Sequence, residues 1–285
     1  MTGSLMNGKT VSAAMREEMK QEVDRLTAKG VQPGLAVVLV GEDAASQVYV
    51  NSKHKTCLEL GYYSEVHRLP ADTTESDLLA LIETLNGQST IHGILVQLPL
   101  PKHINEKAVI DAIAVAKDVD GFHPVSVGNL VIGDESLLPC TPAGVIELLK
   151  RHEVDIAGKH AVVIGRSNIV GKPVSLLLQR ENATVTMCHS RTANMKELTR
   201  QADILVVAIG RANFVDRSFL KPGVVVIDVG MNRLENGKLA GDVDFEDVKD
   251  LCDWITPVPG GVGPMTITML MYNTLKAAKR IHHLT

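Results

Sequence analysis

The segment HAVVIGRSNIVGKP, residues 160–173, decides the fold of the second half of the chain. Its apolar start predicts a strand, Gly165 predicts a tight turn, and a helix is expected from Lys172. Such a turn exposes backbone N–H groups and a positive helix end, which together can bind a pyrophosphate. Ser167 stands where the usual G-x-G-x-x-G pattern has its second glycine. Because similar turns also occur without a ligand, the segment alone leaves a purely structural role open.

Apolar runs of strand length alternate with helical patterns along the rest of the chain. Residues 36–40 and 224–227 are apolar throughout, which is typical of parallel strands covered on both faces by helices. The stretch 118–139 is rich in Gly, Pro and short polar residues and separates two such sets. We therefore predict an α/β fold of two lobes with mainly parallel sheets and a cleft between them. The predicted limits are 1–140, completed by a helix over 271–285, and 141–270.

Composition excludes several classes of protein. The chain has 285 residues, 45% of them hydrophobic, and a net charge of −4, so a nucleic-acid partner is not expected. Since no apolar run reaches the roughly 18 residues of a membrane span and no signal or transit pattern precedes Arg16, a cytoplasmic location without membrane contact is expected. The four cysteines are isolated in the sequence, which favours reduced thiols over a disulfide or a metal site.

The end of the strand predicted over residues 183–188 indicates which nucleotide could bind. NAD sites usually place an acid there for the ribose hydroxyls, but this chain has Ser190 and Arg191 and no acid. A hydroxyl beside a guanidinium suits a 2′-phosphate, which favours NADP. An ordinary solvated Arg191 is the alternative.

Chemically capable side chains also occur in the first lobe. Tyr49 and Lys53 lie four residues apart, on one face of a predicted helix. Tyr-x-x-x-Lys also occurs in short-chain dehydrogenases, but there it follows the nucleotide turn, whereas here it precedes the turn by more than a hundred residues. Gln97 ends an apolar strand, where open α/β sheets place ligand contacts, and Asp120 lies in a turn. A surface pair, a solvated glutamine and a plain turn are the alternative interpretations.

A loop rich in glycine and proline, residues 256–266, leads into the last predicted helix. Its composition leaves the backbone close to whatever lies beside it. The structural need for a tight loop is the alternative explanation.

These segments together resemble the methylenetetrahydrofolate dehydrogenase/cyclohydrolase family along nearly the whole chain. The matching motifs, in family order, are Tyr49-x-x-x-Lys53, VQLPLP (96–101), DVDGF (118–122), GRSNIVGKP (165–173), HSRT (189–192) and PGGVGP (259–264). The resemblance implies an N-terminal folate-binding catalytic domain and a C-terminal Rossmann-type NADP-binding domain. It also implies a homodimer. Trifunctional relatives carry a large formate ligase domain in addition, to which no segment of this sequence corresponds.

The resemblance further implies roles for individual residues. Lys53 would be catalytic, with Tyr49 beside it, Gln97 holding it and Asp120 binding the pterin ring. Substrate contacts would come from Tyr49 and from Val96, Leu98, Pro259, Gly260, Gly261, Val262 and Gly263. NADP would be held by Gly165, Arg166, Ser167, Ser190, Arg191 and Met231.

The chemistry of the two reactions predicts a division of labour. Hydride transfer needs mainly positioning, whereas hydrolysis needs a base, and an amine becomes one only when its pKa is lowered. We therefore expect Lys53 to serve mainly the hydrolysis. Two rival hypotheses are an NADP-dependent dehydrogenase of another substrate, such as a small hydroxy acid or a shikimate-like ring, and a nucleotide sensor without catalysis.

Overall fold

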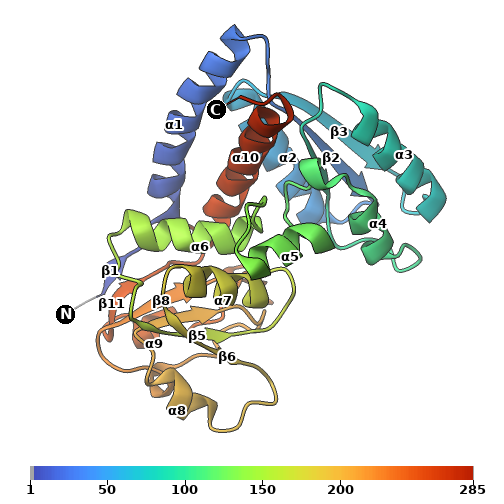
Figure 1. Ribbon diagram of the computed structural model, residues 1–285. Helices are drawn as coiled ribbons and strands as arrows, with labels where there is room; N and C mark the ends of the chain where they lie inside the picture. Colours follow the sequence, from blue (N-terminus) through green and yellow to red (C-terminus); the bar gives the residue numbers. More distant parts are fainter. Residues whose placement is uncertain (1–2, 285) are drawn as a thin grey trace. The chain divides into compact units, whose positions relative to one another are not determined.

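The computed structural model describes residues 3–284 and divides into two compact units (Figure 1). The six-stranded unit comprises Met1–Ala13 and Thr141–Thr266, and the three-stranded unit comprises Ala14–Cys140 and Ile267–Thr285. The first thirteen residues therefore group with the second half of the sequence. The last helix, α10 (Val262–Ile281), begins in the six-stranded unit and continues in the three-stranded unit.

The six-stranded unit is built on a wholly parallel sheet. Its strands, in spatial order, are β1 (Ser4–Leu5), β11 (Cys252–Ile255), β8 (Val224–Asp228), β7 (Ile204–Val207), β5 (His160–Ile164) and β6 (Thr184–Cys188). From β5 the chain passes to the edge strand β6 and then back to β7 on the other side of β5. Doubly wound sheets bind ligands at such a reversal, outside the carboxyl ends of the two central strands.

Helices and one hairpin complete this unit. They are α6 (Cys140–Arg151), α7 (Gly171–Arg180), α8 (Met195–Thr199), α9 (Phe245–Val248), the 3₁₀ turn η2 (Arg217–Phe219) and the hairpin β9 (Asn232–Arg233) to β10 (Leu239–Ala240). Strands β7 and β8 are buried at every position, as expected for strands that are covered on both faces. Their apolar side chains form one core with those of β5, β11 and the neighbouring helices.

The three-stranded unit repeats this arrangement on a smaller scale. Its strands are parallel, in the order β3 (Tyr63–Leu69), β2 (Gly34–Val40) and β4 (Gly93–Val96), so the chain again reverses, here between β2 and β4. Its helices are most of α1 (Gly8–Ala28), α2 (Ala44–Glu59), α3 (Glu75–Gly87), α4 (Glu106–Ala112), the 3₁₀ turn η1 (Val115–Lys117), α5 (Pro124–Ile132) and most of α10. Two parallel α/β sheets confirm the predicted fold class.

The stretch 118–139, which separates the two sets of strands and helices in the sequence, contains helix α5. His123 caps this helix by accepting from the backbone N–H of Val125 at 3.1 Å, and Pro124 opens its first turn. Gly133 ends it with a φ of 87°. Val131 and Ile132 are exposed, so the helix lacks the clean apolar face that would have revealed it in the sequence.

Within residues 3–284, no helix has both the length and the apolar composition required to cross a membrane.

Candidate active site

Lys53 lies on α2 with its amine directed at the end of strand β4. It is 7% exposed, and its Nζ donates to Gln97 Oε1 at 2.8 Å. Gln97 Nε2 donates to the carbonyl of Leu98 at 2.8 Å, so the oxygen of the amide is the atom that faces the amine. Burial lowers the pKa of Lys53, while the charges of Asp120 and Cys140 oppose that shift. The amine is therefore closer to a neutral base than an ordinary lysine is.

Tyr49 lies one turn before Lys53 on the same helix and is half-buried. Burial raises the pKa of its phenol, so at neutral pH Tyr49 is a neutral hydroxyl that can donate or accept.

Asp120 carries the second displaced charge of this unit. Burial raises its pKa to about 6, the charge of Lys53 lowers it, and Asp118 raises it again. A hydrogen bond with the thiol of Cys140 also favours the ionised form. Lys53 and Asp120 thus interact electrostatically inside one unit, and each moderates the cost of burying the other.

The turn that presents Asp120 is held from both sides. Asp118 is 2% exposed and accepts from the backbone N–H of Phe122 and His123 at 3.2 and 2.9 Å, and from Ser126 Oγ at 2.7 Å. Gly121 has a φ of 71°, and a Cβ there would lie 2.6 Å from the backbone N of Pro139. Asp118 therefore holds the turn in place.

Two residues that no sequence pattern singles out support the same turn. Asn273, buried on α10, donates to the carbonyls of Val119 and Leu138 at 2.8 Å each. Cys140 Sγ donates to the carbonyl of Val119 at 3.3 Å. No local pattern identifies Asn273, because its partners lie 135 and 154 residues away along the chain.

Val96 and Leu98 flank Gln97 and line a small hollow in the three-stranded unit together with Asp118, Asp120 and Phe122. The structure thus brings together Tyr49, Lys53 and Gln97, and it places Val96, Leu98 and Asp120 around the same strand end.

The predicted phosphate turn lies between β5 and α7 in the six-stranded unit. Gly165 has a φ of 131°, and a Cβ there would lie 2.3 Å from the carbonyl oxygen of Ala208, so only glycine fits. Ser167 Oγ accepts from the backbone N–H of Val170 and Gly171 at 3.1 and 3.3 Å. Arg166 and Ser167 are both exposed, as residues that meet a solvent-borne ligand must be.

The turn that follows β6 is held by two internal hydrogen bonds. His189 N donates to Thr192 Oγ1 at 2.8 Å, and Arg191 N donates to His189 Nδ1 at 3.1 Å, which shapes a tight turn. Ser190 and Arg191 are exposed at its tip. With no acid at this position, these side chains fit a 2′-phosphate better than free ribose hydroxyls.

The loop from Pro259 to Gly263 belongs to the six-stranded unit, not to the unit that holds Lys53. A Cβ on Gly8 would lie 1.7 Å from the carbonyl oxygen of Gly261, so the start of α1 packs directly on this loop. A Cβ on Gly263 would lie 3.0 Å from Met231 Cε, which places Met231 beside it. Gly260 and Val262 complete the loop.

Two family models match these two halves of the chain. The catalytic domain of tetrahydrofolate dehydrogenase/cyclohydrolase matches residues 6–120, and the NAD(P)-binding domain of the same family matches residues 139–282. The chain belongs to the tetrahydrofolate dehydrogenase/cyclohydrolase family. The N-terminal α/β domain is accordingly the catalytic domain of this family member, and the C-terminal Rossmann-like domain binds NAD(P).

Relatives match over nearly the whole chain. A protein from Brevibacillus brevis named "Bifunctional protein FolD" is 62% identical over 280 residues, which is 98% of this chain and 99% of that protein. The crystal structure of a FolD methylenetetrahydrofolate dehydrogenase/cyclohydrolase from Campylobacter jejuni is 52% identical with a TM-score of 0.96, covering 98% and 99% of the two chains. A Trypanosoma brucei dehydrogenase-cyclohydrolase, solved with NADP and an inhibitor, is 39% identical with a TM-score of 0.95, covering 99% of both.

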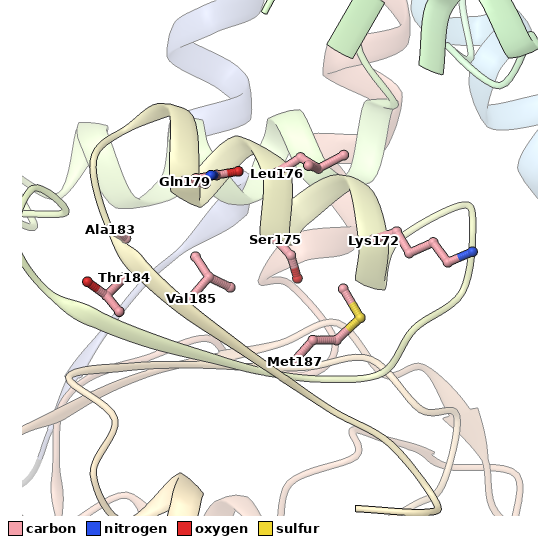
Figure 2. Close-up of a pocket in the computed structure, with 8 residues that line it drawn as sticks. All are labelled: Lys172, Ser175, Leu176, Gln179, Ala183, Thr184, Val185 and Met187. Atoms are coloured by element: carbon pink, nitrogen blue, oxygen red, sulfur yellow. The ribbon is translucent and has the colours of Figure 1, made fainter. Parts of the chain in front are cut away.

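A conspicuous groove of this family member is separate from the predicted cofactor residues. Figure 2 shows it between α7 and the edge strand β6, with Met187 pointing towards the helix. The groove measures roughly 610 Å³ and is lined by Lys172, Ser175, Leu176, Gln179, Ala183, Thr184, Val185 and Met187. None of these is a predicted NADP contact.

Proposed function

We propose that this enzyme oxidises 5,10-methylenetetrahydrofolate with NADP and hydrolyses the methenyl product to 10-formyltetrahydrofolate. The observation that carries the proposal is the hydrogen bond from the buried Lys53 to Gln97, together with the charge of the half-buried Asp120 that acts on Lys53. An amine with a lowered pKa and a carboxylate that can accept paired N–H groups are the groups that a pterin substrate and its hydrolysis require.

The oxidation removes a hydride from the methylene carbon between the two folate nitrogens. NADP, when bound, supplies the hydride acceptor, and lone pairs on the two nitrogens stabilise the resulting methenyl cation. The chain's own task is to orient the reactants. We assign the phosphates to Gly165, Arg166 and Ser167, the 2′-phosphate to Ser190 and Arg191, and the nicotinamide side to Met231.

The hydrolysis adds water to the methenyl carbon. As the oxygen attacks, the neutral amine of Lys53 takes one proton from the water and later releases it to solvent. The bond from this carbon to one ring nitrogen then breaks, and the hydroxyl proton moves to that nitrogen, which leaves the formyl group on the other. Gln97 holds the amine in place, and Tyr49 adds a neutral hydroxyl beside it.

Asp120 is proposed to bind the pterin ring, with Val96 and Leu98 packing nearby and the loop Pro259–Gly263 also contacting the folate. In this proposal the folate-binding domain is residues 1–140 with the helix over 271–285, and the NADP-binding domain is residues 141–270. Hydride transfer requires donor carbon and nicotinamide to meet, so dehydrogenase activity itself tests whether both domains serve one reaction.

One assay tests the proposed function. Purified enzyme is mixed with methylenetetrahydrofolate and either NADP or NAD, and reduced cofactor and methenyl-folate are followed together. We expect both signals, faster with NADP, and the methenyl signal should then decay as hydrolysis proceeds. NADP binding without turnover would support the sensor hypothesis. Oxidation of a hydroxy acid or a shikimate-like ring instead would support the other rival.

The assembly and location are also part of the proposal. We infer a homodimer formed through β6, because this edge strand and the groove beside it leave Val185 and Met187 partly exposed. Sedimentation should give twice the chain mass, and Val185→Lys should give the monomer; a monomeric wild type contradicts the inference.

For the location we propose the cytoplasm. The four cysteines are free and buried, which fits a reducing cytoplasm.

A further inference from the structure

Two buried aspartates of the six-stranded unit bind the backbone that follows strands β7 and β8. Asp242 is 0% exposed and Asp228 is 3% exposed. Asp242 Oδ2 accepts from the N–H of Ile209 at 2.7 Å and of Gly210 at 3.0 Å, and Oδ1 accepts from the N–H of Arg211 at 2.7 Å. One carboxylate thus fixes three consecutive amides of the loop that leaves β7.

Asp228 continues this network to the end of β8. Its Oδ1 accepts from the N–H of Gly230 and of Asp242, and its Oδ2 accepts from the N–H of Val243, all at 2.9 Å. The backbone N–H of Asp228 itself donates to Thr256 Oγ1 at 2.7 Å. The loops after β7, β8 and β11 are therefore joined through two carboxylates and one hydroxyl.

These loops surround the reversal point of the sheet. The loop held by Asp242 begins next to Ala208, whose carbonyl oxygen is the atom that excludes a side chain at Gly165. Gly230, held by Asp228, directly precedes Met231. The two aspartates hence support backbone that lies directly beside Gly165 of the phosphate turn and backbone that directly precedes Met231, the residue that we assign to the nicotinamide side.

We propose that Asp242 and Asp228 are positioning residues that orient the nicotinamide half of NADP for hydride transfer. This inference rests on the proposed function, which places NADP on the six-stranded unit. Both residues act through backbone and touch neither the cofactor nor the folate. A displacement of about 1 Å in such a wall is enough to lower a reaction rate by about a hundredfold.

Carboxylates are required here because every partner of Asp242 is a donor. In Asp242→Asn, either orientation of the new amide directs an NH₂ group at two donors. These are the amides of Ile209 and Gly210 in one orientation, and Arg211 N with Asn232 Nδ2 in the other. The loop must then move, although the side chain keeps its size.

The test compares full-length Asp242→Asn with wild type and with Asp253→Asn, an exposed aspartate of the same unit. We expect kcat of the dehydrogenase to fall by about 10- to 100-fold, with a larger primary deuterium isotope effect because hydride transfer becomes limiting. Affinity for 2′,5′-ADP, which lacks the nicotinamide half, should stay within about twofold, as should the NADP-independent cyclohydrolase rate. Asp253→Asn should match wild type in all three.

A milder variant keeps the proposal testable if Asp242→Asn fails to fold. Asn232 Nδ2 donates to Asp242 Oδ1 at 2.9 Å, so Asn232→Ala removes one of four donors and leaves the three backbone contacts. We expect about a threefold loss of dehydrogenase kcat, in the same direction as the larger variant.

Two outcomes would overturn the inference. Equal losses of dehydrogenase rate, 2′,5′-ADP affinity and cyclohydrolase rate would show that these aspartates only stabilise the domain. Failure of wild type to bind 2′,5′-ADP in competition with NADP would remove the proposed cofactor site and the inference with it. The wild-type measurement distinguishes the second case from the first.

Discussion

The two units of the molecule handle charge in opposite ways. In the three-stranded unit, Lys53 is buried and Asp120 is half-buried, and burial shifts the pKa of both towards neutrality. In the six-stranded unit, the residues assigned to the cofactor, such as Arg166, Ser190 and Arg191, are exposed. Burial prepares a side chain to exchange protons, whereas exposure leaves a side chain free to meet a ligand that arrives fully charged.

Buried carboxylates also differ in purpose between the units. Asp120 faces Lys53 electrostatically, while Asp228 is surrounded by backbone N–H groups. Burial raises the pKa of Asp228 to about 7, even though three hydrogen bonds favour its ionised form. The neighbouring side-chain charges also differ: the charge of Asp242 raises the pKa of Asp228 further, whereas the opposite charge of Lys53 lowers that of Asp120.

The largest effect should come from Lys53→Met, which removes the buried amine and keeps most of its volume. We expect cyclohydrolase activity to fall by about 10²- to 10⁴-fold, because general base catalysis is lost. Dehydrogenase activity should fall much less, because hydride transfer needs no base. Both activities are measured in one sample, with Lys55→Met on the exposed side of α2 as the matched control. Equal losses with intact folate binding would contradict the division of labour.

The next effect concerns Asp120. Asp120→Ala should raise KM for folate by about tenfold or more in both reactions, since a hydrogen-bonded charge is lost from the substrate site.

The wild type should show a related pH dependence of KM for folate. With a pKa of about 6, the carboxylate is ionised above that pH and is lost as the pH falls through it, so KM should rise on the acid side. KM that is flat between pH 5 and 8 would remove Asp120 from the pterin site.

Arg191→Ala tests the exposed half of the comparison. Loss of a guanidinium from a 2′-phosphate should lower kcat/KM for NADP by about 10- to 100-fold and change kcat/KM for NAD by less. Arg200→Ala, an exposed arginine of the same unit, is the control. Cyclohydrolase activity should not change in either variant. An equal loss with NAD and NADP would mean that Arg191 does not read the 2′-phosphate.

Local patterns explain why the fold and several contacts could be predicted from the sequence. Apolar runs such as residues 224–227 predict buried parallel strands, and the four-residue spacing of Tyr49 and Lys53 places both on α2. Long-range contacts leave no such pattern. Asn273 meets Cys140 across 133 residues, and the β8 carboxylate of Asp228 meets amides that lie beyond the β9–β10 hairpin. Nothing in a linear sequence states which buried polar residues will meet.

The smallest expected effect comes from replacing Cys140, which tests how the pKa of Asp120 is set. The single S–H proton of Cys140 can be donated either to the Val119 carbonyl or to the carboxylate of Asp120, and the second contact lowers the pKa of Asp120. In Cys140→Ala this contact is lost, so the pKa of Asp120 should rise and the acid limb of the folate KM profile should move to higher pH. Folate KM itself should rise by about threefold.

Cys140→Ser supplies the control, because a hydroxyl is a stronger donor than a thiol and can restore the contact. The acid limb should then return to the wild-type position or below it. If alanine and serine moved the limb by the same amount, the loss would reflect packing around Asn273 and not the hydrogen bond to Asp120. The pKa of Asp120 would in that case be set by desolvation and by the charges of Lys53 and Asp118, which makes the contrast with Asp228, held by three backbone N–H groups, sharper still.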